Sequence, residues 1–446
     1  MKKLTLFSLL LAFAFMVSAV ETNAPAWLSR PLSQADCINI ALAQNASILK
    51  AQSDLKVSQG VVIQTRAVAL PQLNAGGQYK YSDPNTIENF AATSQPNKNW
   101  NSGIQLVQGI YEGGKLMAAI QAASATKKQS IAQYQTQVAD TLLTVRLAYY
   151  DVLLAAQQIT VNEASVKLLQ KELDGQQRRY DAGTVPHFNV LRAEVAVANA
   201  KPNLFRANSQ YRISKNILAN LLGYNLPREV LENIPLNLMD TFDLADWNMA
   251  LPDAIEQALE RRTELKDLRA QVQLQKLNIT SARSGYQPTV QAFAGYNWFN
   301  AQFTKPTDLD HDIHGWNAGL EMNWAIFDGG LTYGKVKQSK ALYKKSQTEL
   351  EDRSRQIELD VRTAYSDFLE AKEVLDSQTK VQEQAEEALR EANARFDAGT
   401  GTQLDVLDAE TSLTQARTTQ VQALHDYAAA RARLERSIGA ELASAK

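Results

Sequence analysis

The sequence RYDAGT at residues 179–184 returns as RFDAGT at residues 395–400, 216 positions further along the chain (395 − 179). Two more blocks return at this displacement: VRLAY at 145–149 as VRTAY at 361–365, and IYEGG at 110–114 as IFDGG at 326–330. Pro71 returns as Pro288 after 217 positions (288 − 71), so one residue was gained or lost between the copies. Because each copy of such a repeat is one structural unit, the chain is predicted to be a tandem duplication.

Each copy has the same predicted order of elements. The first helix covers about residues 33–69 in one copy and 251–284 in the other. Both end at a proline, which lacks an N–H and disfavours helix in the residue before it. Two strands follow and lead to a Gly-Gly turn, where glycine tolerates positive φ. A helix of about 65 residues then runs to residues 181–183, and a return helix covers about 187–222.

The helix lengths indicate an elongated molecule. At 1.5 Å per residue the long helix spans about 100 Å, whereas the first and return helices each span about 50 Å. We expect the return helix of the first copy and the first helix of the second copy to stack end to end and match the long one. Residues 223–250, which include Pro227 and Pro235, are expected to form a belt at mid-height. Helices this long must pack sideways, as in coiled coils.

The four predicted strands alternate between apolar and polar positions. Odd positions 73–81 are apolar, aromatic or glycine, and even positions 72–80 are Gln, Asn, Gly or Lys. Strands near 100–106, 290–298 and 316–324 follow the same rule, with Phe293 as the exception. This pattern is typical of membrane β-strands of about 9 to 11 residues. The alternative is a soluble sheet packed on helices, but its outer face would carry charges rather than Gln, Asn and Gly.

Four membrane strands cannot form an open sheet, because the edge strands would leave backbone groups unpaired in lipid. Several chains are therefore expected to close one barrel. Two chains would give eight strands and a barrel filled by side chains, whereas three would give twelve and leave a pore.

The N-terminus has the pattern of a secretory signal peptide. Two lysines precede the apolar run 4–17, and Ser18 and Ala19 supply a small-residue cleavage site. No later stretch approaches the roughly 20 apolar residues of a transmembrane helix. A formal net charge of −2 gives no sign of nucleic-acid binding. Cys37 is the single cysteine, which excludes an intramolecular disulfide. We expect it to occupy an apolar position of the first helix.

These patterns divide the chain into five predicted segments. They are a signal peptide (1–19), a first repeat (20–222), an equatorial linker (223–250), a second repeat (251–440) and a C-terminal tail (441–446).

From about Leu32 to Gly439 the chain resembles the TolC-like outer membrane efflux protein family, also called outer membrane factors. The resemblance rests on the duplicated prolines, Gly-Gly turns and Ala-Gly-Thr blocks. It implies a mixed α and β fold: a homotrimer with a twelve-stranded β-barrel continuous with a periplasmic helical barrel of twelve helices and an equatorial belt. It also implies a periplasmic adaptor and an inner-membrane transporter, of the resistance-nodulation-division, ABC or similar type, as partners. No cofactor is implied.

In the family, acidic residues after the second Ala-Gly-Thr block narrow the periplasmic mouth. Asp405 and Asp408 match these positions, and their i, i+3 spacing places them on one helix face. Three chains would present six carboxylates, which favour cations, and crowding would raise some of their pKa values. The alternative is local: Thr402 and Asp405 fit a helix capping box.

The two Ala-Gly-Thr blocks are expected to form the tips that contact the adaptor, through Gly183, Thr184, Gly399 and Thr400. The first repeat departs from the family at its tip. Asn189 stands where some members carry an acid, and Arg192 is the counterpart of Asp408. The first repeat therefore lacks the acid that makes links in the closed state of such members, and Arg192 is a candidate to pair with a neighbouring acid instead.

The sequence offers no residues for catalysis. It lacks a glycine-rich phosphate loop and a nucleophile elbow. His311 and His314, with Asp310 and Asp312, are the one metal-site alternative, but they fall in the predicted loop between the third and fourth strands. The expected function is an exit duct for a drug, metal-ion or polypeptide cargo that the sequence does not identify. A non-pore coiled-coil envelope protein and a passive porin are the alternatives.

Overall fold

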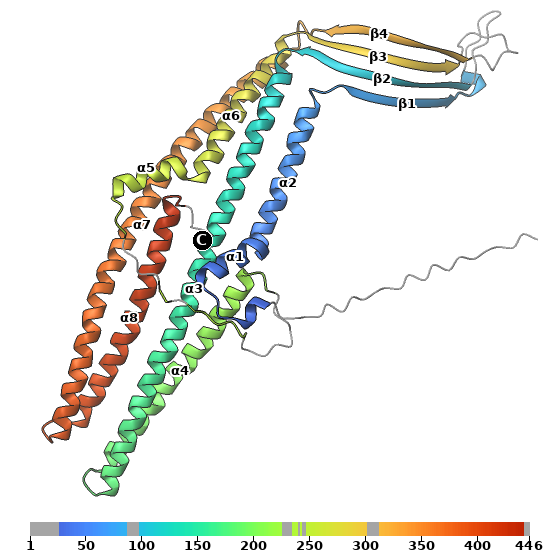
Figure 1. Ribbon diagram of the computed structural model, residues 1–446. Coiled ribbons are helices and arrows are strands. Elements are labelled where there is room, and N and C mark those ends of the chain that lie inside the picture. The colour runs from blue at the N-terminus through green and yellow to red at the C-terminus, as the bar shows by residue number, and fades with distance from the viewer. Residues whose placement is uncertain are drawn as a thin grey trace, which may run out of the picture.

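Two helices of 67 residues each, α3 (Lys115–Asp181) and α7 (Leu331–Asp397), run along an elongated molecule (Figure 1). This computed structural model describes residues 26–86, 98–224, 234–239, 241–242, 247–300 and 312–440. The predicted signal peptide and C-terminal tail lie outside the described residues. No helix among those residues has an apolar stretch of the length that crossing a membrane requires.

The remaining elements follow the order expected for a duplication. They are the helices α1 (Gln34–Gln44), α2 (Ala46–Ala67), α4 (His187–Leu221), α5 (Leu251–Arg261), α6 (Thr263–Arg283) and α8 (Gln403–Ser437), and the strands β1 (Gln72–Tyr81), β2 (Lys98–Glu112), β3 (Thr289–Asn300) and β4 (Asp312–Asn323), with short 3-10 helices at Ala26–Ser29, Pro84–Thr86 and Ser284–Tyr286.

The first helix of each repeat is broken rather than continuous. The break falls at Asn45, between α1 and α2, and at Arg262, between α5 and α6. Both residues leave helical geometry, with φ −63° and ψ 128° at Asn45 and φ −55° and ψ 124° at Arg262. They are equivalent in the duplication, 217 positions apart (262 − 45).

The structure corrects the predicted stacking of the half-length helices. The C-terminus of α4 meets the start of α2, since Asn45 Nδ2 donates to Leu221 O at 2.6 Å, and the C-terminus of α8 meets the start of α6. Each return helix is thus continued by a helix of its own repeat (Figure 1). Because of the break, α2 and α6 each begin with a new helix N-terminus. The N-terminus of α2 faces the last carbonyls of α4, and that of α6 faces the last carbonyls of α8. The side chains of Asn45 and Arg262 donate to these carbonyls, and the positive end of each helix dipole also favours them.

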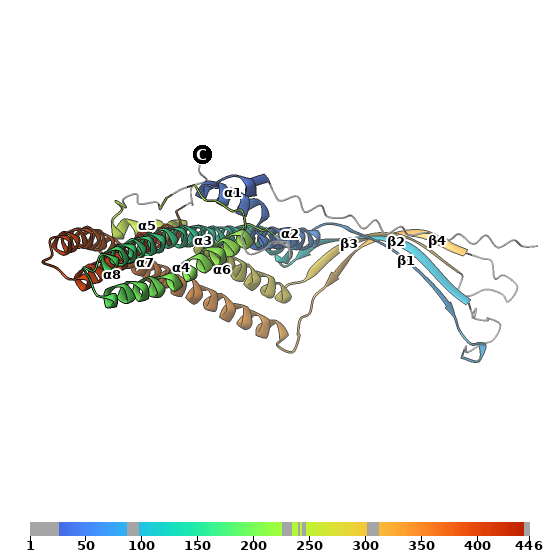
Figure 2. The same ribbon diagram turned by 90° about the horizontal axis from the view of Figure 1, so that it is seen from below.

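The helices lie side by side as four columns. The α6/α8 column packs against both long helices, and the α2/α4 column packs against α3 (Figures 1 and 2). At mid-height, α1, α3, α4 and α8 share a core with Ile234, Leu236 and Phe242 of the linker, and Tyr149 and Tyr150 are fully buried in it. Cys37 is buried in this core, which confirms that it is an apolar position of the first helix.

The strands form one antiparallel sheet in the order β1-β2-β3-β4. A bulge between Gly109 and Tyr111 of β2 inserts one residue opposite β3. The sheet continues from the upper ends of the helices and bends away from their axis (Figures 1 and 2). Every strand residue is exposed or half-buried, so no layer formed by the described residues of one chain covers the sheet.

Candidate functional site

The two faces of the sheet differ in chemistry, as the alternation predicted. Registered rows of residues run across all four strands. One face carries the row Ala75, Ile104, Tyr296, Trp316 and the row Leu73, Leu106, Ala294, Ala318; the other carries the row Asn74, Gln105, Gly295, Asn317 and the row Gly76, Gly103, Asn297, Gly315. The sheet therefore presents one apolar face and one face of amides and glycines.

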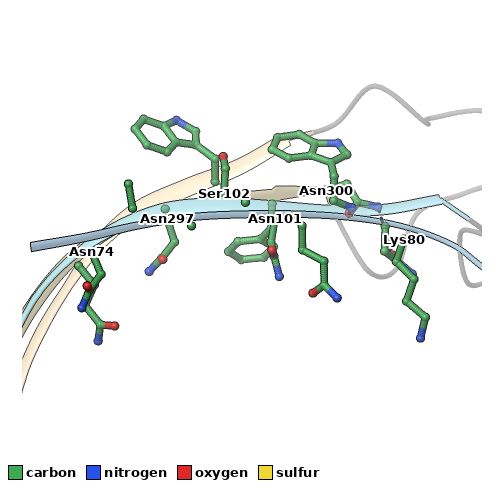
Figure 3. A pocket seen from close by; sticks show the side chains of 16 residues that line it. Asn74, Lys80, Asn101, Ser102, Asn297 and Asn300 are labelled. Atoms are coloured by element: carbon green, nitrogen blue, oxygen red, sulfur yellow. Dashed lines mark hydrogen bonds between the residues drawn. The ribbon is translucent and has the colours of Figure 1, made fainter. Parts of the chain in front are cut away.

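A hollow of about 730 Å³ lies against the amide face of β1, β2 and β3. Asn74, Asn101, Asn297 and Lys80 point from the same side of the ribbon (Figure 3). Asn297 Nδ2 donates to Asn317 Oδ1 at 3.1 Å, so amides bond to one another across the strands. Hydrogen-bonding groups that remain free for water suit this face to an aqueous lumen.

Phe293, the exception in the predicted alternation, lies on the amide face opposite Gly319. A Cβ at residue 319 would come within 2.9 Å of its ring. Because Gly319 has no side chain, the Phe293 ring can lie directly over its backbone. An aromatic ring that covers a cross-strand glycine is a known way to stabilise that glycine in a sheet.

Both Ala-Gly-Thr tips are Schellman turns. At the first, Gly183 N donates to Tyr180 O at 2.8 Å and Thr184 N donates to Arg179 O at 2.9 Å. The second tip repeats these bonds from Gly399 and Thr400. Gly183 has φ +73° and Gly399 has φ +76°, values that glycine adopts without strain. Apart from the adjoining residues, no atom of the described part of the chain lies within 4 Å of a Cβ built at either glycine, so these positions are open on their outer side.

The two tips are also bonded to each other. Arg179 of α3 forms an ion pair with Asp397 of α7 at 3.0 Å, and its guanidinium lies 4.4 Å from the centre of the Phe396 ring. The pair is exposed, so its net contribution to stability is about 0–1 kcal/mol.

Asp405 and Asp408 lie on the exposed face of the first turns of α8. The capping box is present: Asp405 Oδ2 accepts from the Thr402 backbone N–H and hydroxyl, both at 2.8 Å. The backbone N–H and then the hydroxyl of Thr402 hold the pKa of Asp405 below its usual value. Within one chain the charged form is thus favoured, opposite to the shift expected from crowding in a ring.

The first-repeat counterparts have different contacts. The Asn189 carbonyl accepts from Gln403 Nε2 at 3.1 Å, which joins α4 to the start of α8. The Arg192 guanidinium stacks on the ring of Phe188, 4.9 Å from its centre. Phe188 occupies the neighbouring turn of the same helix, so the predicted pairing of Arg192 with an acid gains no support from the single chain.

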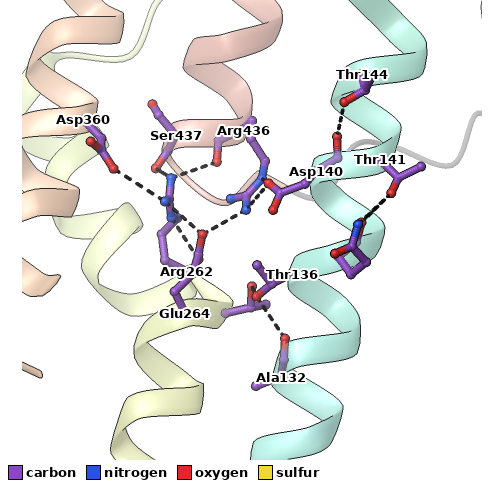
Figure 4. A network of polar contacts seen from close by, with 12 residues as sticks. Ala132, Thr136, Asp140, Thr141, Thr144, Arg262, Glu264, Asp360, Arg436 and Ser437 are labelled. Atoms are coloured by element: carbon purple, nitrogen blue, oxygen red, sulfur yellow. Dashed lines mark hydrogen bonds and ion pairs between the residues drawn. The ribbon is translucent and has the colours of Figure 1, made fainter. Parts of the chain in front are cut away.

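The sequence did not reveal the polar network at the start of α6. Arg262 donates to the carbonyls of Arg436 and Ser437 and pairs with Glu264 at 3.0 Å, while Arg436 binds Glu264 at 2.9 Å and Asp140 at 2.7 Å (Figure 4). Arg262 is 6% exposed. Arg262 also lies 3.8 Å from the Asp360 carboxylate of α7, so the network connects α3, α6, α7 and α8 where the half-length helices meet. Its only sequence signal was the equivalence of Arg262 to Asn45.

Two of the four residues of the alternative metal site, Asp310 and His311, lie outside the described residues. The other two, Asp312 and His314, belong to β4 rather than to the predicted loop. His314 Nδ1 is 2.8 Å from the Tyr296 hydroxyl across β3 and β4. Within the described ranges, no group of three or more His, Cys, Asp or Glu side chains is arranged to hold a metal ion.

The model of the outer membrane efflux protein family matches residues 37–224 and 254–440. Outer membrane protein TolC of Escherichia coli (strain K12) is 25% identical over 399 residues, which cover 87% of this chain and 78% of TolC. The proteases secretion protein PrtF of Dickeya chrysanthemi is 21% identical over 86% of this chain and 82% of its own. The crystal structure of CusC superposes with a TM-score of 0.77 at 18% identity, over 92% of each chain. The family model spans both repeats, and this chain therefore belongs to the outer membrane efflux protein family.

Proposed function

We propose that the protein is the outer-membrane exit duct of a tripartite efflux or type I secretion system. The observation that carries this proposal is the combination, in a member of this family, of a two-faced four-stranded sheet with helices that extend from one of its ends. The relatives' names include secretion of proteases, and the family name refers to efflux, so the cargo class stays open. No catalytic role is proposed.

The sheet's edges support closure by several copies, and three copies are the number in this proposal. The strands β1 and β4 each have one hydrogen-bonded neighbour in the chain, and a second copy can pair with them. Three copies give twelve strands, wide enough for an aqueous lumen lined by the amide face, with the apolar face toward lipid.

The helical part carries matching edges. Exposed apolar side chains line the outer helices, namely Phe188, Val195 and Phe205 of α4 and Leu359, Leu369 and Val374 of α7. Packing of α7 against the α2/α4 column of the next copy would bury them and join twelve columns into a tube. Residues 20–222 and 251–440 would then be the two repeats, and 223–250 the equatorial linker.

At the lower end, the open tips at Gly183, Thr184, Gly399 and Thr400 are the proposed docking surface for a periplasmic adaptor, which connects the duct to an inner-membrane transporter. Asp405 and Asp408, exposed at the start of α8, are the proposed aperture, and Asn189 and Arg192 are their first-repeat counterparts. The capping role of Asp405 is compatible with this, because one carboxylate oxygen bonds Thr402 and the negative charge stays exposed.

The test is single-channel conductance of the purified protein in a planar bilayer. Asp408→Asn removes one ring of charge without touching the capping box, and it should reduce cation preference and block by a trivalent cation. Adding Asp405→Asn should reduce both further. Glu383→Gln, at an exposed acid of α7, is the matched control. Unchanged preference and block in the double variant would assign the selectivity to other residues.

The duct itself is tested by fractionation. The protein should be found in the outer-membrane fraction and run as a trimer in mild detergent. A stable monomer in the soluble periplasmic extract would contradict the barrel and favour the non-pore coiled-coil alternative.

A further inference from the structure

Between the tips and mid-height, the second repeat contacts the first where α8 packs against α3. We define this α3–α8 seam by its side-chain contacts: Gln403 Nε2 to the Asn189 carbonyl of the neighbouring α4 (3.1 Å), Thr414 Oγ1 to Ser165 Oγ (3.1 Å) and His425 Nε2 to Asp151 Oδ1 (2.9 Å). They run from the tip to mid-height. The seam joins the α3/α4 hairpin to the α7/α8 hairpin.

Glu410 of α8 is buried in the tip half of this seam, with 4% of its surface exposed. Its Oε2 atom has no hydrogen-bond partner among the described residues. From α3, the negative charge of Glu172 acts on Glu410. Glu172 is itself held in place by Gln176, whose Nε2 donates to Glu172 Oε1 at 2.6 Å. The seam therefore brings two carboxyl groups together and leaves Glu410 Oε2 without a donor among the described residues.

We propose that Glu410 is a proton-operated lock of the α3–α8 seam. When its carboxyl group carries a proton, the two hairpins are held together. When that proton is lost to water, a second carboxylate is buried beside Glu172, and the hairpins loosen at the tip.

The chemistry of the site supports protonation. A neutral carboxyl group supplies the missing O–H donor and avoids burying a charge. Burial, and then the negative charge of Glu172, raise the pKa of Glu410 to about 7. The basic side chain next along α8, Arg417, is seven residues from Glu410 and pairs with Glu386 of α7 at 2.9 Å. Among the described residues, no basic side chain stabilises the Glu410 carboxylate.

The sign of the pH dependence follows from the raised pKa. The tight seam binds the proton more strongly than an open one, in which Glu410 has its ordinary pKa of about 4.5. The lock is fully present below that value and weakens as pH rises, until the proton is lost at about pH 7. If the protein is the duct proposed above, its mouth is held more tightly closed in acid. That consequence rests on the proposed function, whereas the lock itself does not.

Amide hydrogen exchange of the detergent-solubilised full chain measures the lock without transport. The readout is the protection factor of residues 403–414, which divides out the intrinsic effect of pH on exchange. In the unsubstituted protein this protection should fall about tenfold between pH 6 and pH 8, the change expected for one proton bound with a pKa near 7. Glu410→Gln is permanently neutral and of similar shape, so it should keep its protection at pH 8.

Two further variants separate the lock from a general packing role. Glu172→Gln removes the like charge but keeps the Glu410 acid, so the fall between pH 6 and pH 8 should shrink. Asp174→Asn, at an exposed acid two residues along α3, should leave the tenfold fall intact. If Glu410→Gln does not assemble, the Glu172→Gln comparison still decides.

Two results would overturn the proposal. One is an unchanged fall in protection in Glu410→Gln or in Glu172→Gln. The other is a rise to full protection at pH 8 when 5 mM Ca²⁺ or Na⁺ is added to the unsubstituted protein, together with low protection of Glu410→Gln that neither ion raises. The oxygen cluster would then be a cation site and not a site of protonation.

Discussion

Replacing Arg262 by alanine should loosen the joint where α8 ends against α6. The guanidinium donates to the carbonyls of Arg436 and Ser437, and it pairs with Glu264 at 3.0 Å and Asp360 at 3.8 Å. It is 6% exposed, and burial lowers its pKa although Glu264 counteracts this effect. The alanine variant leaves two helix-terminal carbonyls without their donor in a site that water reaches poorly.

The size of the effect follows from what remains. Removing one partner of a buried ion pair costs about 3–5 kcal/mol. Glu264 keeps Arg436 at 2.9 Å, which places the cost near the lower end, at about 3 kcal/mol per chain. Arg355→Ala is the matched control, because its ion pair with Asp352 is exposed and contributes about 0–1 kcal/mol.

Amide exchange of residues 430–440 measures the local free energy of opening. A loss of about 3 kcal/mol corresponds to a decrease in protection of about a hundredfold, compared with less than about fivefold for the control. Arg262→Lys should fall between them, since an ammonium group can reach a carbonyl but cannot form the guanidinium's forked contacts. Equal effects of Arg262→Ala and Arg355→Ala would show that the carbonyls find other donors, and the capping role would be refuted.

Three further results are expected. Gly223→Ala should lower the thermal midpoint of the trimer more than Gly183→Ala does. Both glycines have positive φ, so both substitutions strain the backbone. At Gly223 the new Cβ would in addition lie 2.5 Å from the backbone oxygen of Gln44, whereas at Gly183 it would meet no such atom. Bulky replacement of both Gly183 and Gly399 should abolish chemical cross-linking to the adaptor while trimers persist, and surviving cross-links would move the docking surface elsewhere. His425→Gln should lower the thermal midpoint more at pH 5.5 than at pH 8.5. Burial lowers the pKa of His425, but the hydrogen bonds and charges of Asp151 and Asp426 together outweigh it and raise that pKa. The stabilising pairing is therefore fully present below about pH 6.5 and is lost as pH rises through the raised value. Equal shifts of the midpoint at both pH values would contradict this.

Much of the architecture was predictable because its determinants are local in the chain. The Gly-Thr pairs at 183–184 and 399–400 define helix ends, since glycine alone enters the left-handed region without strain. Alternation with period two determines which side chains share a face of a strand, whichever strand lies beside it. The capping box of Thr402 and Asp405 is likewise contained in four consecutive residues.

The sheet order and the joints required the tertiary structure. Helix lengths allowed α4 to be continued by α2 or by the first helix of the second repeat, and only the bond from Asn45 to Leu221 selects α2. Arg262 carries no local signal for a break, because arginine is a good helix former. Its conformation is explained by carbonyls 174 and 175 residues away.

Glu410 illustrates the same division. Its sequence neighbours Ala409 and Thr411 give no sign that the acid is buried, and the helical pattern places it near the exposed Asp408. Only the packing of α8 against α3 brings Glu172 beside it and excludes water. The repeats, the turns and the two strand faces could be predicted from the sequence, because they depend on bonds within a few residues. Which helix ends meet and which charges are buried became known only from the packing, because both depend on groups far apart in the chain.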